Sequence, residues 1–190
     1  PFAESSSSVT VRTGVTPPKV TIVQPTLTTK YAIGDTISFS GYAEYQGVRV
    51  SNSALTWSII QQHNLHEHLV DEISGVASGS FQPGEHSDNT RYMVCLFATL
   101  GEGLSDQQCV TVQPRTVPVT FNSEPLGAPV SYIDEEIEVL APYIASPIVN
   151  SVQTISAAAI HQGRSFITWS DGLGTRERTF TVPSTPISFT

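Results

Sequence analysis

The chain has 190 residues, which is enough for one large or two small domains. It carries 9 Lys and Arg against 17 Asp and Glu, a formal net charge of −8, and this argues against a surface that binds nucleic acid or anionic membranes. No stretch approaches 18 apolar residues, so we do not expect membrane insertion. Ser, Thr, Val and Ile dominate, and 13 Gly and 13 Pro interrupt the chain, which predicts an all-β fold.

Residues 1–18 are predicted to form an N-terminal arm or linker. They contain a serine run at 5–8 and end on two consecutive prolines. Within the arm, residues 9–13 alternate like a short strand that has no partner there. Two interpretations stay open. The arm is a flexible leader, or Val9 and Val11 belong to a strand that adds to a sheet edge of another copy.

Residues 19–114 are predicted to form an immunoglobulin-like β-sandwich. Short strands are expected near 19–25, 36–41, 54–60, 74–81, 91–100 and 106–112. Trp57 lies on the middle strand, which is typical of the immunoglobulin fold, and we expect it to be packed in the core.

Residues 115–190 are predicted to form a second, smaller β-sandwich. Prolines at 114–118 mark the boundary, and strands are expected near 117–121, 149–158, 164–169, 180–182 and 187–189. A unit of this size is near the lower limit for an independent core, so we expect it to pack against the first.

The two cysteines are spaced to face each other across a hairpin. If the chain turns about Glu102, residues whose numbers sum to 204 lie opposite one another, and Cys95 and Cys109 meet this condition. We therefore predict a disulfide, which places the protein in a secreted, extracellular location. The alternative is two free thiols in a reducing cytosol.

Four histidines fall in two places that the sandwich would bring together. His63, His66 and His68 follow the Trp57 strand, and His86 precedes the strand that starts near residue 91. These strands are antiparallel neighbours in an immunoglobulin-like sandwich, so the four imidazoles are expected to meet at one end of it. Such a cluster suits a Zn or Cu ion. The alternative is a polar loop with hydrogen-bonding histidines.

No catalytic motif is found. The nucleophile elbow, the P-loop and the dinucleotide-binding glycine motif are all missing from the sequence. The acidic residues at 134–138 lack the EF-hand spacing and predict a solvated loop. A saturated four-histidine site would be structural, since catalysis needs an open position on the metal. We therefore do not expect an enzyme.

Several segments resemble known extracellular modules. Residues 34–43, GDTISFSGYA, are similar to the second-strand motif of PKD-like domains. Residues 55–57, LTW, with the three histidines that follow, resemble the LxW…HHxxHxH stretch of modules found after secreted glucose/sorbosone dehydrogenase-type β-propellers. Gln62 replaces the first histidine of that pattern. Residues 166–172, FITWSDG, look like the F.sWSDG motif of the small β-module that comes next.

The resemblance covers roughly residues 18–190 and implies secreted, non-catalytic accessory modules of carbohydrate-active or cell-surface proteins. The sugar-oxidising propeller is not in this chain, so we do not expect its activity here.

Three functions are compatible with the sequence. The first is an extracellular module pair that binds a glycan or cell-surface polymer. The second is a fibre subunit that binds copies of itself through the arm, and the third, least favoured, is a metalloenzyme using the histidines.

Overall fold

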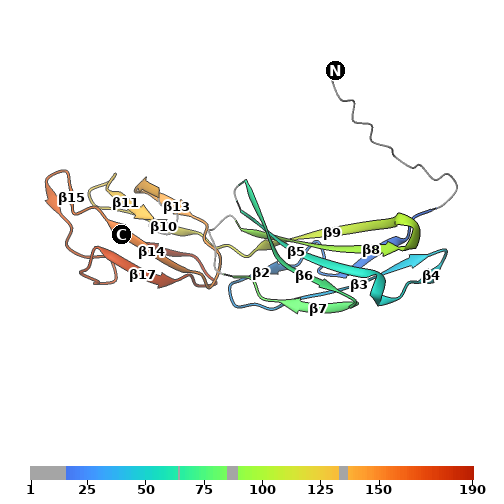
Figure 1. The fold of residues 1–190 in the computed structure, drawn as a ribbon. Helices are drawn as coiled ribbons and strands as arrows, with labels where there is room; N and C mark the ends of the chain where they lie inside the picture. Colours follow the sequence, from blue (N-terminus) through green and yellow to red (C-terminus); the bar gives the residue numbers. More distant parts are fainter. Residues whose placement is uncertain (1–15, 64, 85–89, 133–136) are drawn as a thin grey trace, which may run out of the picture.

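The computed structural model describes residues 16–63, 65–84, 90–132 and 137–190 (Figure 1). The predicted all-β fold class is confirmed, since these ranges consist of strands, turns and two single 3-10 turns, Asn52–Ala54 and Gly101–Gly103. In this part of the chain, no helix is long and apolar enough to cross a membrane.

The N-terminal sandwich consists of two sheets. In the first sheet, the central strand β3 pairs with the three others, and its members are β1 (Lys19–Gln24), β3 (Ile37–Tyr45), β4 (Val48–Arg49) and β7 (Ser78–Phe81). The second sheet has the order β2 (Lys30–Tyr31), β9 (Leu104–Pro114), β8 (Arg91–Leu100), β5 (Leu55–His63) and β6 (His66–Ser74). All pairs in this sandwich are antiparallel except β2 with β9.

Trp57 lies at the centre of the first core, as expected. Its side chain is fully buried, its ring centre is 4.7 Å from that of Phe39, and its indole N–H donates to the carbonyl oxygen of Val76 at 3.1 Å. Gly41 allows the two sheets to approach here. A Cβ at that position would lie 2.7 Å from Leu96 Cδ2 and 3.1 Å from the Trp57 ring, which both belong to the opposite sheet.

The outer edge of β1 is closed by side chains of the opposite sheet. The backbone N–H of Val20 donates to Asp106 Oδ2 at 3.0 Å, and that of Ile22 donates to Gln108 Oε1 at 2.6 Å. These N–H groups would otherwise be open to pairing with another chain. The two bonds therefore join the sheets and protect the edge.

The C-terminal strands form two further sheets and a short hairpin around a second core. One sheet has the order β13 (Tyr143–Ala145), β10 (Val119–Phe121), β18 (Ile187–Phe189), and the other β12 (Ile137–Leu140), β11 (Pro129–Tyr132), β14 (Val152–Ala157), β17 (Glu177–Thr181). The hairpin is β15 (Ile160–His161) with β16 (Arg164–Ser165). The buried members of this core include Phe121, Tyr132, Ile155, Trp169 and Val182.

Several local expectations are corrected. The segment after His63, expected to be a loop, turns back and forms strand β6. The strand expected at 164–169 covers only Arg164–Ser165, because the chain then bends inward to bury Trp169. Strands β11, β12 and β13 were not expected. Glu138 of the acidic segment lies on β12, and residues 134–136 lie outside the described ranges.

The two units contact each other through the backbone as well as through side chains. Arg115 N donates to the Tyr31 carbonyl, and its guanidinium forms a 3.0 Å ion pair with Asp35. The backbone N–H of Ile33 donates to the Val149 carbonyl at 3.0 Å. Ile148 packs in the first core. These contacts explain why Figure 1 shows the two units end to end rather than as separate bodies on a free linker.

Candidate functional site

The predicted disulfide is present. Cys95 on β8 and Cys109 on β9 are bonded, and their Cα atoms are 4.0 Å apart. The register of the two strands keeps the expected sum of 204 along its whole length. Cys95 is almost fully buried on the outer face of the sheet, opposite Ser58 of β5. The bond therefore fixes the middle of the hairpin.

Three of the predicted histidines lie on one face of the β5–β6 hairpin. His63 pairs with His66 next to the turn, and Gln61 pairs with His68, so strand alternation places all three imidazoles on the same side. The Nε2 atoms of His63 and His68 are 3.1 Å apart, and their rings are nearly parallel with centres separated by 5.1 Å. The His66 ring centre is 5.9 Å from that of His63.

The four-histidine cluster is only partly described. His86 lies outside the described ranges. Among the residues that the structure does describe, no group of three or more His, Cys, Asp or Glu is arranged to hold a metal ion. His66 and His68 also stand on a strand and not in a loop, because the turn after His63 is short enough to let the chain pair at once.

Gln62, which departs from the family pattern, points to the opposite face. Its side-chain amide donates to Glu67 at 2.6 Å, and its oxygen accepts from Arg91 Nε at 2.9 Å. A polar row therefore crosses β8, β5 and β6 behind the histidines. On the histidine side, Gln61 is buried and donates to the Tyr92 hydroxyl at 3.1 Å. Both faces of the hairpin end are thus held in place.

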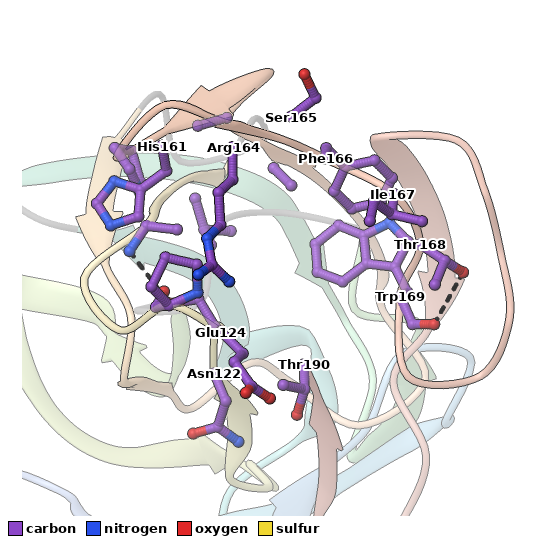
Figure 2. A pocket seen from close by; sticks show the side chains of 17 residues that line it. Asn122, Glu124, His161, Arg164, Ser165, Phe166, Ile167, Thr168, Trp169 and Thr190 are labelled. Carbon is purple, nitrogen blue, oxygen red and sulfur yellow. Dashed lines mark hydrogen bonds between the residues drawn. The ribbon is translucent and has the colours of Figure 1, made fainter.

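A pocket in the C-terminal unit is a second candidate, which the sequence did not predict (Figure 2). Its cavity has a volume of about 330 Å³. One side is formed by the segment 122–130, and the other by the β15–β16 hairpin with the residues that follow it. The hairpin turns at Gln162 and Gly163, which both have positive φ, as a tight two-residue turn requires. This turn presents His161 and Arg164 side by side as paired residues.

The lining combines aromatic, cationic and anionic groups. Figure 2 shows Arg164 extending into the pocket between His161 and Trp169, with Glu124 and Asn122 on the opposite side. His161 bonds the Leu126 carbonyl oxygen through Nε2 at 3.0 Å, so this nitrogen carries the proton. That bond ties the hairpin to the facing segment.

The aromatic wall rests on the core. Phe166 packs edge-on against Trp169, with ring centres 5.6 Å apart, and Ile167 is exposed at the rim. Trp169 itself is buried and donates its indole N–H to the Thr175 carbonyl at 2.8 Å. Phe166 therefore presents an apolar surface that a ligand can contact, backed by a residue that cannot move freely.

The WSDG segment forms a structural turn. Gly172, with φ of +89°, donates its N–H to the Trp169 carbonyl oxygen, and Trp169 N donates to the Leu173 carbonyl. Asp171 is held by the Arg178 guanidinium through two hydrogen bonds of 2.7 and 3.1 Å. These bonds hold the pKa of the Asp171 carboxyl below its ordinary value of 3.8.

A pair of buried phenols fills the first core close to the histidine hairpin. Tyr31 and Tyr92 meet edge-on with ring centres 5.3 Å apart, and the Tyr31 hydroxyl donates to the Thr90 carbonyl at 2.9 Å. Burial, and then the neighbouring Tyr92, raise the pKa of Tyr31 well above its ordinary value of 10.0. Burial also raises the pKa of Tyr92.

The predicted assembly arm belongs to residues 1–18. Val9 and Val11 lie outside the described residues, so their predicted strand stays a prediction.

Comparison with known proteins adds no relative, since no family model, curated protein or solved structure matches the chain. The PKD-like resemblance therefore also stays an expectation.

Proposed function

We propose that this chain is a non-catalytic, extracellular binding module whose C-terminal pocket takes a saccharide. The observation that carries the proposal is the pocket lining, in which the Phe166 ring shares one cavity with Arg164, Glu124 and Asn122. Binding sites for small ligands combine an apolar surface with a few polar groups that set orientation, in cavities of about 300–1,000 Å³. Sugars need this combination, because their rings carry both apolar C–H faces and hydroxyl groups.

The polar groups suit hydroxyl recognition. A carboxylate accepts hydrogen bonds, a guanidinium donates several in a fixed plane, and an amide does both, so adjacent hydroxyls of one sugar ring can be bound at once. Arg164 is also able to hold a sugar carboxylate through two parallel hydrogen bonds. The pocket thus accommodates neutral and acidic saccharides, with affinity for acidic ones expected to be higher.

Two further features support a binding module over an enzyme. Glycoside hydrolysis generally uses two carboxylates flanking the bond to be cleaved, and Glu124 is the one Asp or Glu side chain among the described residues of the lining. The Cys95–Cys109 disulfide supports an extracellular location, because such bonds persist in oxidising compartments.

The experiment is a saccharide array followed by calorimetric titration of the best hits. Arg164→Ala, at an exposed position, is expected to weaken binding by about tenfold or more, and Phe166→Ala by a similar factor. Arg49→Ala, an exposed arginine on β4 of the other sandwich, serves as the matched control and keeps full affinity. Absence of saccharide binding, or equal binding by Arg164→Ala, would reject the pocket as the site.

A fibre subunit is the second candidate. Among the residues that the structure describes, β6 is an unpaired edge of its sheet over nine residues, and all of them except Ile73 are exposed. An edge of this length can accept a strand from another copy, although Asp71 and Glu72 disfavour it. Deleting residues 1–18 is expected to abolish assembly while both sandwiches stay folded. Unchanged sedimentation after the deletion would reject this candidate.

A further inference from the structure

The histidine face of the β5–β6 hairpin brings two imidazole nitrogens to a distance that suits a hydrogen bond and equally suits a shared metal ion. Two imidazoles from neighbouring strands lie nearly parallel, with an angle of 18° between the rings, and bring their Nε2 atoms to 3.1 Å. As neutral rings they share one proton between these nitrogens, one donating and the other accepting. Each ring nitrogen in that position is also a ligand atom for a transition-metal ion.

From this distance we infer that His63 and His68 form a two-imidazole chelate for a Zn or Cu ion. An ion bound to imidazole lies about 2.0–2.1 Å from each nitrogen. Two such bonds at angles of about 90–109° place the nitrogens about 2.8–3.4 Å apart. The observed 3.1 Å falls in this range, so the ion replaces the shared proton with little movement of either ring.

The scaffold holds both ligands in position. His63 ends β5 directly after Gln62, which is bonded to Arg91 on one side and Glu67 on the other. Gln61 anchors the same strand to the buried Tyr92 hydroxyl. The backbone beneath the imidazoles is already fixed in three hydrogen-bonded strands, so binding has to order only the two side chains.

The remaining coordination positions are open. His66 and His68 are exposed, so water completes the coordination of the ion. The carboxylate of Glu67 points to the other face, where it is bonded to Gln62. Gln62 pairs with Arg91, and Tyr92 pairs with Val112 near the end of β9. The β5–β6 turn therefore lies at the end of the first sandwich where β9 continues into the second unit. The ion would thus sit near the junction visible in Figure 1, where it can contact a ligand or a second molecule.

The test uses the full chain without an affinity tag. Zn(II) is titrated calorimetrically, and Cu(II) is added at one equivalent for electron paramagnetic resonance, which counts coordinated imidazole nitrogens. We expect saturable binding of one Zn per chain and two imidazole nitrogens on Cu. His63→Gln and His68→Gln each weaken Zn binding by about tenfold or more, since each removes one of two protein ligands.

Controls separate the chelate from general histidine binding. His161→Gln, in the other unit, and Glu72→Gln, at an exposed position farther along β6, are expected to retain wild-type affinity, and His66→Gln to change it by less than either ligand variant. Circular dichroism of each variant checks that it is folded. No saturable Zn binding, unchanged affinity in a folded His68→Gln protein, or a Cu spectrum without imidazole nitrogen would overturn the assignment.

Discussion

Asp171 and Arg178 form a bidentate ion pair, with Oδ2–Nη2 at 2.7 Å and Oδ1–Nη1 at 3.1 Å. Asp171 lies in the turn that follows Trp169 and accepts the backbone N–H of Leu173. The guanidinium carbon is 4.0 Å from the centre of the Phe189 ring on the last strand. One ion pair therefore connects the WSDG turn, strand β17 and strand β18, which explains the turn's composition without a ligand.

Replacing Asp171 with Asn is expected to lower the melting temperature at neutral pH, because Arg178 loses its charged partner beside an aromatic core. Since the folded pKa of Asp171 is depressed, the stabilisation is fully present above its unfolded value near 3.8. It is lost as pH falls through the folded pKa. Melting curves of both proteins at several pH values should therefore converge in acid. Glu177→Gln, an exposed carboxylate one residue from Arg178, is the control, and an equal effect there would contradict the assignment.

Removing the disulfide is expected to destabilise the first sandwich substantially. The bond closes a loop with a sequence separation of 14, and the chain-entropy model gives about 3 kcal/mol for a loop of this size. Cys95→Ala with Cys109→Ala should lower the free energy of unfolding, measured in urea, by this amount. The wild type should respond to reductant and the double variant should not. Two alkylated thiols in the denatured, unreduced wild type would refute the bond.

Tyr31→Phe is expected to cost about 1 kcal/mol of stability at neutral pH, since the buried Thr90 carbonyl loses its donor. The raised pKa of Tyr31 has a second consequence at alkaline pH. Above the ordinary value of 10.0 the unfolded chain releases a proton that the folded chain retains, so stability falls as pH rises. Urea unfolding between pH 8 and 11 should show a shallower fall in Tyr31→Phe. Parallel curves for the two proteins would mean that Tyr31 does not govern alkaline unfolding.

Gly41→Ala is expected to cost about 1–3 kcal/mol through overpacking. The added methyl group would lie 2.6 Å from the Thr21 carbonyl oxygen of the neighbouring strand β1 and 2.7 Å from Leu96 Cδ2 of the opposite sheet. Gly84→Ala is the matched control, because a Cβ there meets no atom of the described residues within 4 Å. Thermal unfolding of both variants decides the matter, and equal melting temperatures would contradict the proposed close approach of the sheets.

The part of the candidate sites that could be predicted was local in sequence. Cys95 and Cys109 flank one hairpin, so a single turn position sets their pairing. The approach of His63 and His68 was predicted in outline, but the strand that carries His68 was not recognised, because residues 66–74 mix charged and apolar side chains on an exposed edge. Without a buried face, no clean alternation appears in the sequence.

The sequence by itself determined the all-β class, the buried Trp57 and the cysteine pairing, because alternation, turn residues and hairpin register act over a few neighbouring positions. Only the tertiary structure decided the C-terminal pocket. Glu124 and Arg164 are far apart in the chain and line one pocket because the β15–β16 hairpin lies against the segment at 122–130, held by the His161 bond to Leu126. Such contacts depend on how separate strands pack in one core, which no local pattern encodes.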